Sequence, residues 1–161
     1  MRALAVRSNA SGRAYLTGGA SAVLLDWRAS TLDVDLSIFP EDDRVLRVIP
    51  ELKEMLNINV ELASPADFIP PLPGWQDRSL FITREGPLSF HHYDFYSQSL
   101  AKLGRGHRKD LLDVGSLIAQ GLVNREKLVE LFAEIEPELY RYPAIDPASF
   151  RRALESSLQL Q

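Results

Sequence analysis

The 161-residue sequence contains no cysteine, so disulfide bonds, thiolate metal sites and cysteine nucleophiles are excluded. It contains no apolar run as long as a membrane span, and residues 1–16 lack the long apolar stretch of a secretory signal peptide. We therefore expect a cytoplasmic protein without a membrane partner. The length favours one domain with a small helical annex, and a hydrophobic content of 45% is sufficient for a core.

The sequence also lacks an excess of positive charge. It has 18 Lys and Arg against 22 Asp and Glu, which gives a net charge of −4. A protein that grips a long nucleic-acid backbone usually presents a basic face. Basic residues gather only locally, in a cluster that suits a triphosphate or the tip of an RNA better than a duplex: Lys102, Arg105, His107, Arg108 and Lys109.

The most informative segment runs from Tyr15 to Leu36 and begins with a pair of glycines after an apolar strand. Gly18 and Gly19 lack a Cβ atom, so their backbone can approach a phosphate closely. The helix that follows them points its amide end toward such an anion. The segment is therefore typical of a phosphate-binding corner.

Two aspartates follow in the next predicted strand. Asp33 and Asp35 are two residues apart, so both side chains leave the same face of that strand, while Val34 and Leu36 take the other face. Two neighbouring carboxylates repel each other unless cations lie between them. Since Mg²⁺ prefers carboxylate oxygens, this pattern favours magnesium bound to a nucleoside triphosphate. A simple strand–helix–strand corner with surface acids is the alternative.

The periodicity of apolar residues predicts an α/β (α+β) fold: a small mixed sheet with flanking helices and a C-terminal helical subdomain. The expected domains are 1–93 and 94–161. Strands are expected at 13–17, 31–39 and about 58–62, with a hairpin over 79–93; helices are expected at 19–27, 41–56, 94–103, 107–120, about 124–135 and from 148. Residues 1–12 predict a frayed lead-in or partial helix, and 64–75 a proline-rich loop. Pro50 predicts a break or kink in its helix.

Thr17-Gly18-Gly19 and Asp33-Val34-Asp35-Leu36, taken together, resemble the signature of the DNA-polymerase-β-like nucleotidyltransferase superfamily. The minimal bacterial members are most similar, namely the AbiE-type toxins and the small nucleotidyltransferase antitoxins. The resemblance implies an enzyme that uses Mg²⁺ or Mn²⁺ to transfer a nucleoside monophosphate from an NTP. Two metal ions can stabilise the entering and leaving oxygens in this reaction.

The superfamily usually adds a third carboxylate on a later strand, and Glu61 in Val60-Glu61-Leu62 fits that context. The resemblance therefore implies that Glu61 joins Asp33 and Asp35 as a metal ligand and catalytic residue. Its alternative is an exposed strand glutamate, and Asp67 and Asp94 are competing third acids. Asp67 lies in the proline-rich segment and Asp94 is expected to cap a helix.

Two further residues near the glycine corner are candidate phosphate ligands. Ser21, in the first turn of the helix, can donate to a phosphate oxygen, or it can simply support the helix start. Arg28 lies between the helix and the aspartate strand, where its planar guanidinium can reach a β- or γ-phosphate. Its alternative is a solvated loop arginine.

The segment SLAKLGRGHRKDLLDV resembles a helical segment of AbiE-type toxins. The resemblance implies that Lys102 and Arg105 contact the triphosphate, and that Asp110 and Asp113 orient those cations or contact the base or ribose. Asp110 and Asp113 are three residues apart and can share one helix face. A helix corner laced with surface ion pairs is the alternative.

Three functions follow from these patterns. The first is a toxin–antitoxin-type enzyme that transfers a nucleoside monophosphate to RNA, such as a tRNA end, or to a protein hydroxyl. The second is an adenylylating antitoxin that acts on a partner toxin. The third is a non-catalytic NTP-binding module of the same fold. The adjacent His91 and His92 point in opposite directions on a strand, so they cannot form a joint metal site.

Overall fold

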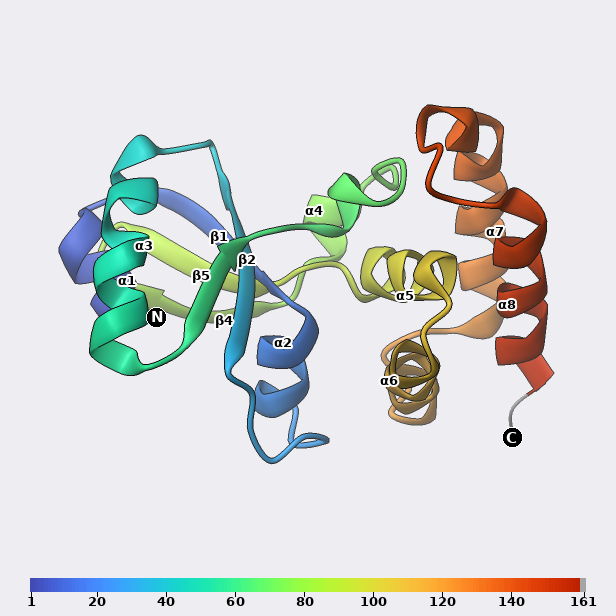
Figure 1. The fold of residues 1–161 in the computed structure, drawn as a ribbon, viewed down its shortest axis with the longest axis horizontal. Helices are drawn as coiled ribbons and strands as arrows, with labels where there is room; N and C mark the ends of the chain where they lie inside the picture. Colours follow the sequence, from blue (N-terminus) through green and yellow to red (C-terminus); the bar gives the residue numbers. More distant parts are fainter. Residues whose placement is uncertain (160–161) are drawn as a thin grey trace. The chain divides into compact units, whose positions relative to one another are not determined.

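The computed structural model describes residues 1–159, which form two compact units. Unit 1 comprises residues 1–64 and 79–93, and unit 2 comprises residues 65–78 and the chain from 94 onward. Residues 65–78 therefore group with the C-terminal helices rather than with the sheet. Figure 1 shows the elements in chain order.

Unit 1 is built on a five-stranded mixed sheet. The strands lie in the order β3 (Asn59–Leu62), β2 (Asp33–Phe39), β1 (Gly12–Thr17), β5 (Leu88–His92) and β4 (Phe81–Glu85). β1 is antiparallel to β2 and parallel to β5, whereas β2 and β3 are parallel. The predicted fold class, with its small mixed sheet and helical C-terminal part, is confirmed.

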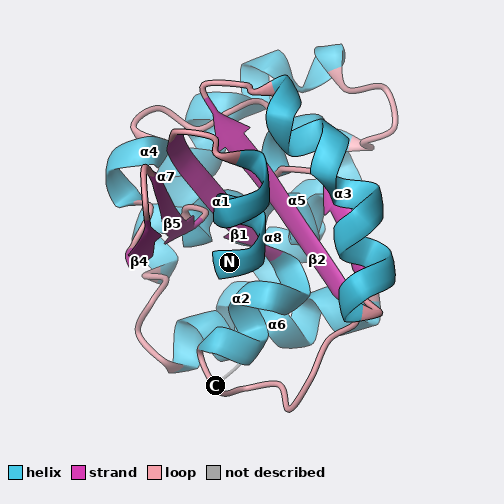
Figure 2. Cartoon of the chain, turned by 90° about the vertical axis from the view of Figure 1, so that its left-hand side faces the viewer, coloured by secondary structure: helices cyan, strands magenta, loops and turns pink. Residues whose placement is uncertain are grey.

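Helices α1 (Arg2–Ser8) and α3 (Asp43–Leu56) lie over one face of the sheet (Figure 2). Alternation along the strands places apolar side chains on this face, where Leu16, Leu36 and Phe90 are buried in the core. α3 contributes Val45, Ile49 and Leu52 at helical spacing. The opposite face of β2 and β3 carries the candidate carboxylates.

The sequence predicts a break or kink at Pro50. The break is wrong, because α3 is one helix from Asp43 to Leu56 with Pro50 inside it, whereas a kink at this position stays a prediction. A proline inside a helix removes the hydrogen bond to the carbonyl four residues earlier, here that of Leu46, and its ring crowds that carbonyl. Both Pro50 and Leu46 are exposed, so water can solvate the freed carbonyl. Burial of Val45, Ile49 and Leu52 on the other face stabilises the helix across this position.

Unit 2 consists of helices and short helical turns. Its elements are η1 (Pro65–Asp67), α4 (Trp75–Arg78), α5 (Phe95–Arg105), α6 (Arg108–Ala119), α7 (Arg125–Ile135), η2 (Glu136–Arg141) and α8 (Pro147–Gln159). The predicted cap at Asp94 is confirmed, because Asp94 accepts hydrogen bonds from the backbone of Tyr96 and Ser97. Asn124 caps α7 in the same way and accepts a hydrogen bond from the backbone of Lys127. None of the helices formed by residues 1–159 is both long and apolar enough to span a membrane.

Candidate functional site

The turn between β1 and α2 (Gly18–Leu24) brings the glycine corner next to an aspartate. Gly18 has φ = +60°, a conformation that residues with a Cβ atom rarely adopt. A Cβ atom at Gly18 would lie 3.1 Å from Oδ2 of Asp35. The corner and the aspartate strand therefore meet, as the spacing of the sequence predicts.

Gly19 is packed against the loop that precedes β2. A Cβ atom at Gly19 would lie 2.5 Å from Oγ1 of Thr31 and 3.3 Å from Nη1 of Arg28. Any side chain larger than hydrogen would force Thr31 to move. The same contacts place the Arg28 guanidinium beside the glycine corner, where the sequence predicts a phosphate-binding cation.

Strand register brings three carboxylates to one face of the sheet. In the β1–β2 pair Thr17 lies opposite Asp35, and in the parallel β2–β3 pair Asp35 lies opposite Glu61. Asp33 leaves the same face as Asp35 because the two are separated by one residue. Asp33 and Glu61 are exposed and Asp35 is half-buried, so the group is open to solvent.

Asn59 connects two of these carboxylates, a role that its position in the sequence did not predict. Its Nδ2 donates to Oδ1 of Asp33 at 3.3 Å and to Oε1 of Glu61 at 2.9 Å. One neutral amide thus lies between two negative groups that would otherwise repel each other. The only signal in the sequence is its position two residues before Glu61, on the same strand face.

Ser21 is buried, and its hydroxyl makes hydrogen bonds within unit 1. Its Oγ donates to the carbonyl oxygen of Leu16 at 3.1 Å, and it lies 3.0 Å from Nδ1 of His92. Since the hydroxyl has one proton, His92 Nδ1 is assigned as the donor to Ser21. Burial lowers the pKa of His92 to about 4, which keeps the ring neutral. This contact ties α2 to β5.

The two histidines leave opposite faces of β5, as predicted. His92 is on the core face, whereas His91 packs against Tyr15, with ring centroids 5.5 Å apart. Burial lowers the pKa of His91 as well. The sequence prediction that they cannot form a joint metal site is confirmed.

A second group of predicted residues comes together within unit 2. Lys102 on α5 is buried, and its Nζ lies 2.7 Å from Oδ2 of Asp113 and 3.3 Å from Oδ1 of Asp110 on α6. Asp110 and Asp113 share one helix face, as their spacing predicts. The group is thus a buried ion-pair cluster between two helices, rather than the set of surface pairs that was the alternative reading.

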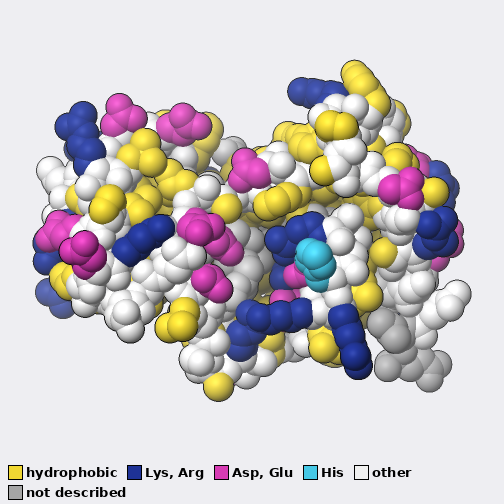
Figure 3. All heavy atoms as spheres, viewed as in Figure 1, with side chains coloured by type: hydrophobic (Ala, Val, Ile, Leu, Met, Phe, Trp, Pro, Cys, Tyr) yellow, Lys and Arg dark blue, Asp and Glu magenta, His cyan; other side chains and the backbone are white. Residues whose placement is uncertain are grey.

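Arg105 extends this cluster toward solvent. Its Nη2 lies 3.0 Å from Oδ1 of Asp110, and its guanidinium lies over the ring of Phe68, 5.2 Å from the centroid. Arg105 also lines a cavity of about 550 Å³ in unit 2, together with His107, Arg141 and Tyr142. Lys and Arg side chains gather around a histidine over the α5–α6 region (Figure 3). Of the four predicted residues in this segment, Arg105 is the one whose side chain is exposed.

The competing third acids have other surroundings. Asp94 is buried, caps α5 and pairs with Arg78, whose Nη2 lies 2.9 Å from its Oδ2. Asp67 lies in η1 of unit 2, beside the cavity that Arg105 lines. Glu61 is therefore the acid that shares a strand face with Asp33 and Asp35.

The arrangement within residues 1–159 contains no group of three or more His, Cys, Asp or Glu side chains close enough to hold a metal ion as it stands. The donor set nevertheless suits magnesium chemically, since Asp33, Asp35 and Glu61 offer only hard oxygen atoms on one face of the sheet. Asn59 occupies the space between Asp33 and Glu61. Its amide is the group that would have to give way to a cation.

Comparison with known proteins assigns the class of protein. Residues 2–150 match the model of a family described as "Nucleotidyltransferase of unknown function (DUF6036)". Because the match spans most of the chain, the protein belongs to this nucleotidyltransferase family. No curated protein and no solved structure matches the chain. Enzymes of this class transfer a nucleoside monophosphate, and their substrate is an NTP.

Proposed function

We propose that this protein is an active, magnesium- or manganese-dependent enzyme that transfers a nucleoside monophosphate from an NTP to a hydroxyl group of RNA or of a protein. The family match supports the class of reaction. The observation that carries the assignment to particular residues is the close approach of Asp35 to Gly18, where an added Cβ atom would lie 3.1 Å from the carboxylate. A phosphate against the glycine backbone would therefore lie beside an acidic strand.

In this proposal Asp33, Asp35 and Glu61 hold the metal ions. When bound, Mg²⁺ would neutralise the carboxylates and polarise the phosphate oxygens. The backbone of Gly18 and Gly19, which carries no Cβ atom, would lie against the phosphate chain. The Arg28 guanidinium, which lies beside Gly19, is placed to pair with a phosphate oxygen.

Ser21 has a supporting role in the proposal. Its proton is already donated to Leu16, so it anchors the start of α2 rather than donating to a phosphate. Glu61 is the general base candidate, since it is exposed and lies opposite Asp35 in the β2–β3 register. The unit 2 cluster is proposed to hold Arg105 in position for an anionic group, with Lys102, Asp110 and Asp113 as its buried support.

The acceptor and the biological role belong to the same proposal. A toxin–antitoxin setting, with transfer to a tRNA end, follows from the similarity of the glycine and aspartate motifs to AbiE-type toxins. Transfer to a partner toxin is the alternative that the net charge of −4 favours, since an acidic protein attracts a nucleic acid poorly. A non-catalytic NTP-binding module is the third possibility, and the Asn59 bridge across two proposed ligands is the observation that favours it.

The test is transfer of label from each α-³²P-labelled NTP, with Mg²⁺ or Mn²⁺, to total tRNA, to co-purified proteins or to the protein itself. We expect the variant Asp33→Asn/Asp35→Asn to lose at least 100-fold in rate, because the proposed metal ligands are gone. The control Glu54→Gln removes an exposed acid of α3 and should transfer at the wild-type rate. Transfer by the double variant at the wild-type rate would contradict the proposal.

A binding measurement separates an inactive module from an enzyme with an unrecognised acceptor. We expect an NTP with Mg²⁺ to raise the melting temperature of the wild type and to leave that of Asp33→Asn/Asp35→Asn unchanged. An NTP that binds, without label transfer to any acceptor tested, would favour the non-catalytic module. If no NTP bound to the wild type, both the active enzyme and the non-catalytic NTP-binding module would be excluded.

A further inference from the structure

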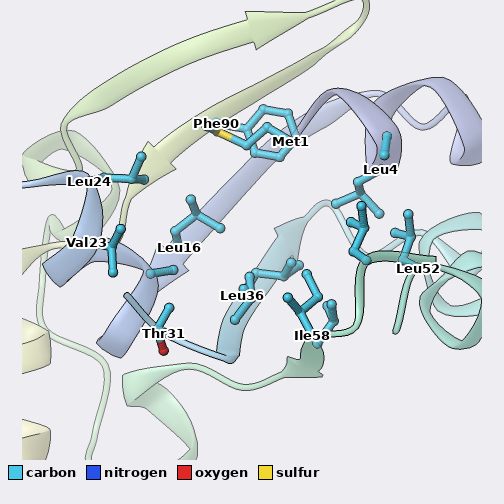
Figure 4. Close-up of a pocket in the computed structure, with 15 residues that line it drawn as sticks. Met1, Leu4, Leu16, Val23, Leu24, Thr31, Leu36, Leu52, Ile58 and Phe90 are labelled. Carbon is cyan, nitrogen blue, oxygen red and sulfur yellow. The ribbon is translucent and has the colours of Figure 1, made fainter. Parts of the chain in front are cut away.

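Unit 1 contains an apolar cavity of about 230 Å³ on the face of the sheet opposite the carboxylates (Figure 4). Its lining comes from α1, α2 and α3 and from four strands, so the site is concave rather than a flat helix face. Leu16, Leu36 and Phe90 form part of a floor that is at most 4% exposed. Met1, Leu24 and Leu56 form an exposed rim, with 41–46% of their surface accessible.

Side chains in this cavity offer almost nothing to a water molecule. Thr31 carries the only polar side chain of the lining. Its Oγ1 already donates to the carbonyl of Asp33 and accepts from the backbone N–H of the same residue. A buried water needs two to four polar partners, whereas apolar cavities stay dry and take up apolar molecules. Since protein interiors are normally close-packed, a space of this size favours an apolar occupant.

We infer that the cavity binds the unbranched aliphatic chain of a small amphiphile. A cavity of about 150 Å³ lined by Leu, Ile and Phe takes up benzene, so the present volume is sufficient for roughly eight or nine carbon atoms. The lining is aliphatic except for Phe90, so it packs against a methylene chain and provides little for a stacked nucleobase. The lining contains no charged side chain, so the polar end of the ligand stays at the rim in water.

This site is separate from the proposed nucleotide site, and the inference does not depend on the proposed function. Leu36 faces the cavity while its neighbour Asp35 leaves the opposite face of β2. Thr31 lines the cavity and also lies beside the glycine corner, where a Cβ atom at Gly19 would be 2.5 Å from its Oγ1. Occupancy can therefore be measured directly, without an activity assay.

The first experiment is calorimetric titration of the full chain with n-alcohols from butanol to dodecanol. We expect saturable binding at one site, with affinity rising about fourfold per methylene group up to about eight carbons and then levelling off. A series without saturation would overturn the inference. A rise that continues through dodecanol would also overturn it, because it would indicate surface adsorption rather than a cavity of fixed volume.

Two variants locate the site. Ala3→Leu fills part of the cavity from α1 and should weaken octanol binding at least tenfold, whereas the control Val6→Leu enlarges an exposed side chain of the same helix and should bind as the wild type does. If Ala3→Leu does not fold, Leu56→Arg places a charge at the exposed rim and serves instead. Unchanged octanol affinity in the filled or charged variant would contradict the site.

Sedimentation of the wild type provides a last check on the occupant. We expect octanol to bind equally well at low and high protein concentration. If self-association prevented octanol binding, a second copy of the chain would occupy the cavity, and the inference of a small-molecule ligand would be wrong.

Discussion

At the scale of single residues, the candidate site depends on two glycines without Cβ atoms and on an amide that separates two carboxylates. Gly18 and Gly19 have no Cβ atom, and Asp35 and Thr31 pack where one would point, 3.1 Å and 2.5 Å from its position. Asn59 places one amide between Asp33 and Glu61. A larger side chain at either glycine would collide with its neighbour, and a negative charge at Asn59 would be repelled by Asp33 and Glu61. Each position can therefore be tested by a conservative substitution.

We predict that Asn59→Asp lowers the free energy of unfolding by about 1–2 kcal/mol at pH 7, because it removes two donated hydrogen bonds and adds a third negative charge beside Asp33 and Glu61. Urea denaturation measures this change. Asn59→Leu removes the hydrogen bonds without adding charge, and it should cost less. If Asn59→Leu destabilised the protein as much as Asn59→Asp, repulsion of the added carboxylate by Asp33 and Glu61 would not be the cause of the lost stability.

His92 should make stability depend on pH. Burial lowers its folded-state pKa to about 4, below the ordinary value of 6.5. Above pH 6.5 the ring is neutral in both states, so its contribution to the free energy of unfolding is constant. As the pH falls from 6.5 toward 4, the ring is protonated in the unfolded state but not in the folded state, so the protein loses stability. We predict that between pH 7.5 and 4.5 the melting temperature of the wild type falls by several degrees more than that of His92→Gln. His107→Gln, which alters an exposed histidine, should retain the wild-type pH dependence.

At the scale of strands and helices, pairing between elements assembles what no single segment contains. The sequence was sufficient to predict the two faces of β2, because alternation depends only on local geometry. It did not reveal the Asn59 bridge, because that contact depends on the parallel register of β2 and β3. That Asp110 and Asp113 orient Lys102 and Arg105 was implied by the resemblance alone, because the spacing within α6 cannot show a pairing with side chains of α5.

The same limit explains the errors in individual elements. Proline has a strong local effect, so Pro50 predicted a break or kink in α3. The helix is not broken, because burial of its opposite face outweighs the local cost of the proline. Residues 64–75 were expected to be irregular, yet they include η1 and the start of α4. The glycine corner and the caps were predictable, because their conformations depend on residues adjacent in sequence.

The helix corner between α5 and α6 gives a prediction at this scale. Lys102→Met leaves Asp110 and Asp113 buried without their lysine, so we expect the free energy of unfolding to fall by about 3 kcal/mol. Lys109→Met alters an exposed lysine of α6 and should change stability by less than about 0.5 kcal/mol. Chemical denaturation of both variants checks this. Equal stability of the two would mean that the buried pairs do not support the corner.

At the scale of the whole molecule, the chain forms two units that are not consecutive in sequence. Residues 65–78 group with the C-terminal helices, and within unit 2 Arg78 pairs with the capping residue Asp94. Ile69 and Leu72 of the same segment are buried. A chain cut at residue 93 would therefore keep the sheet intact but remove the packing partners of this segment.

We predict that a fragment of residues 1–93 keeps slow amide exchange in β1, β2 and β5, whereas the amides of residues 65–78 exchange much faster than in the full chain. Unit 1 retains its sheet and core in this fragment, while Ile69 and Leu72 lose the helices that cover them. Hydrogen–deuterium exchange with mass spectrometry compares the two proteins. Equal protection of residues 65–78 in both would show that the segment folds without the C-terminal helices.

The pairing of Asp35 with Glu61 across β2 and β3 also constrains which changes in chain length the protein tolerates. Adding or deleting one residue within β3 would exchange the two faces of the strand. Glu61 would then point into the apolar layer and Val60 into water. In a library of indels, we expect single-codon changes to be lost from these two strands.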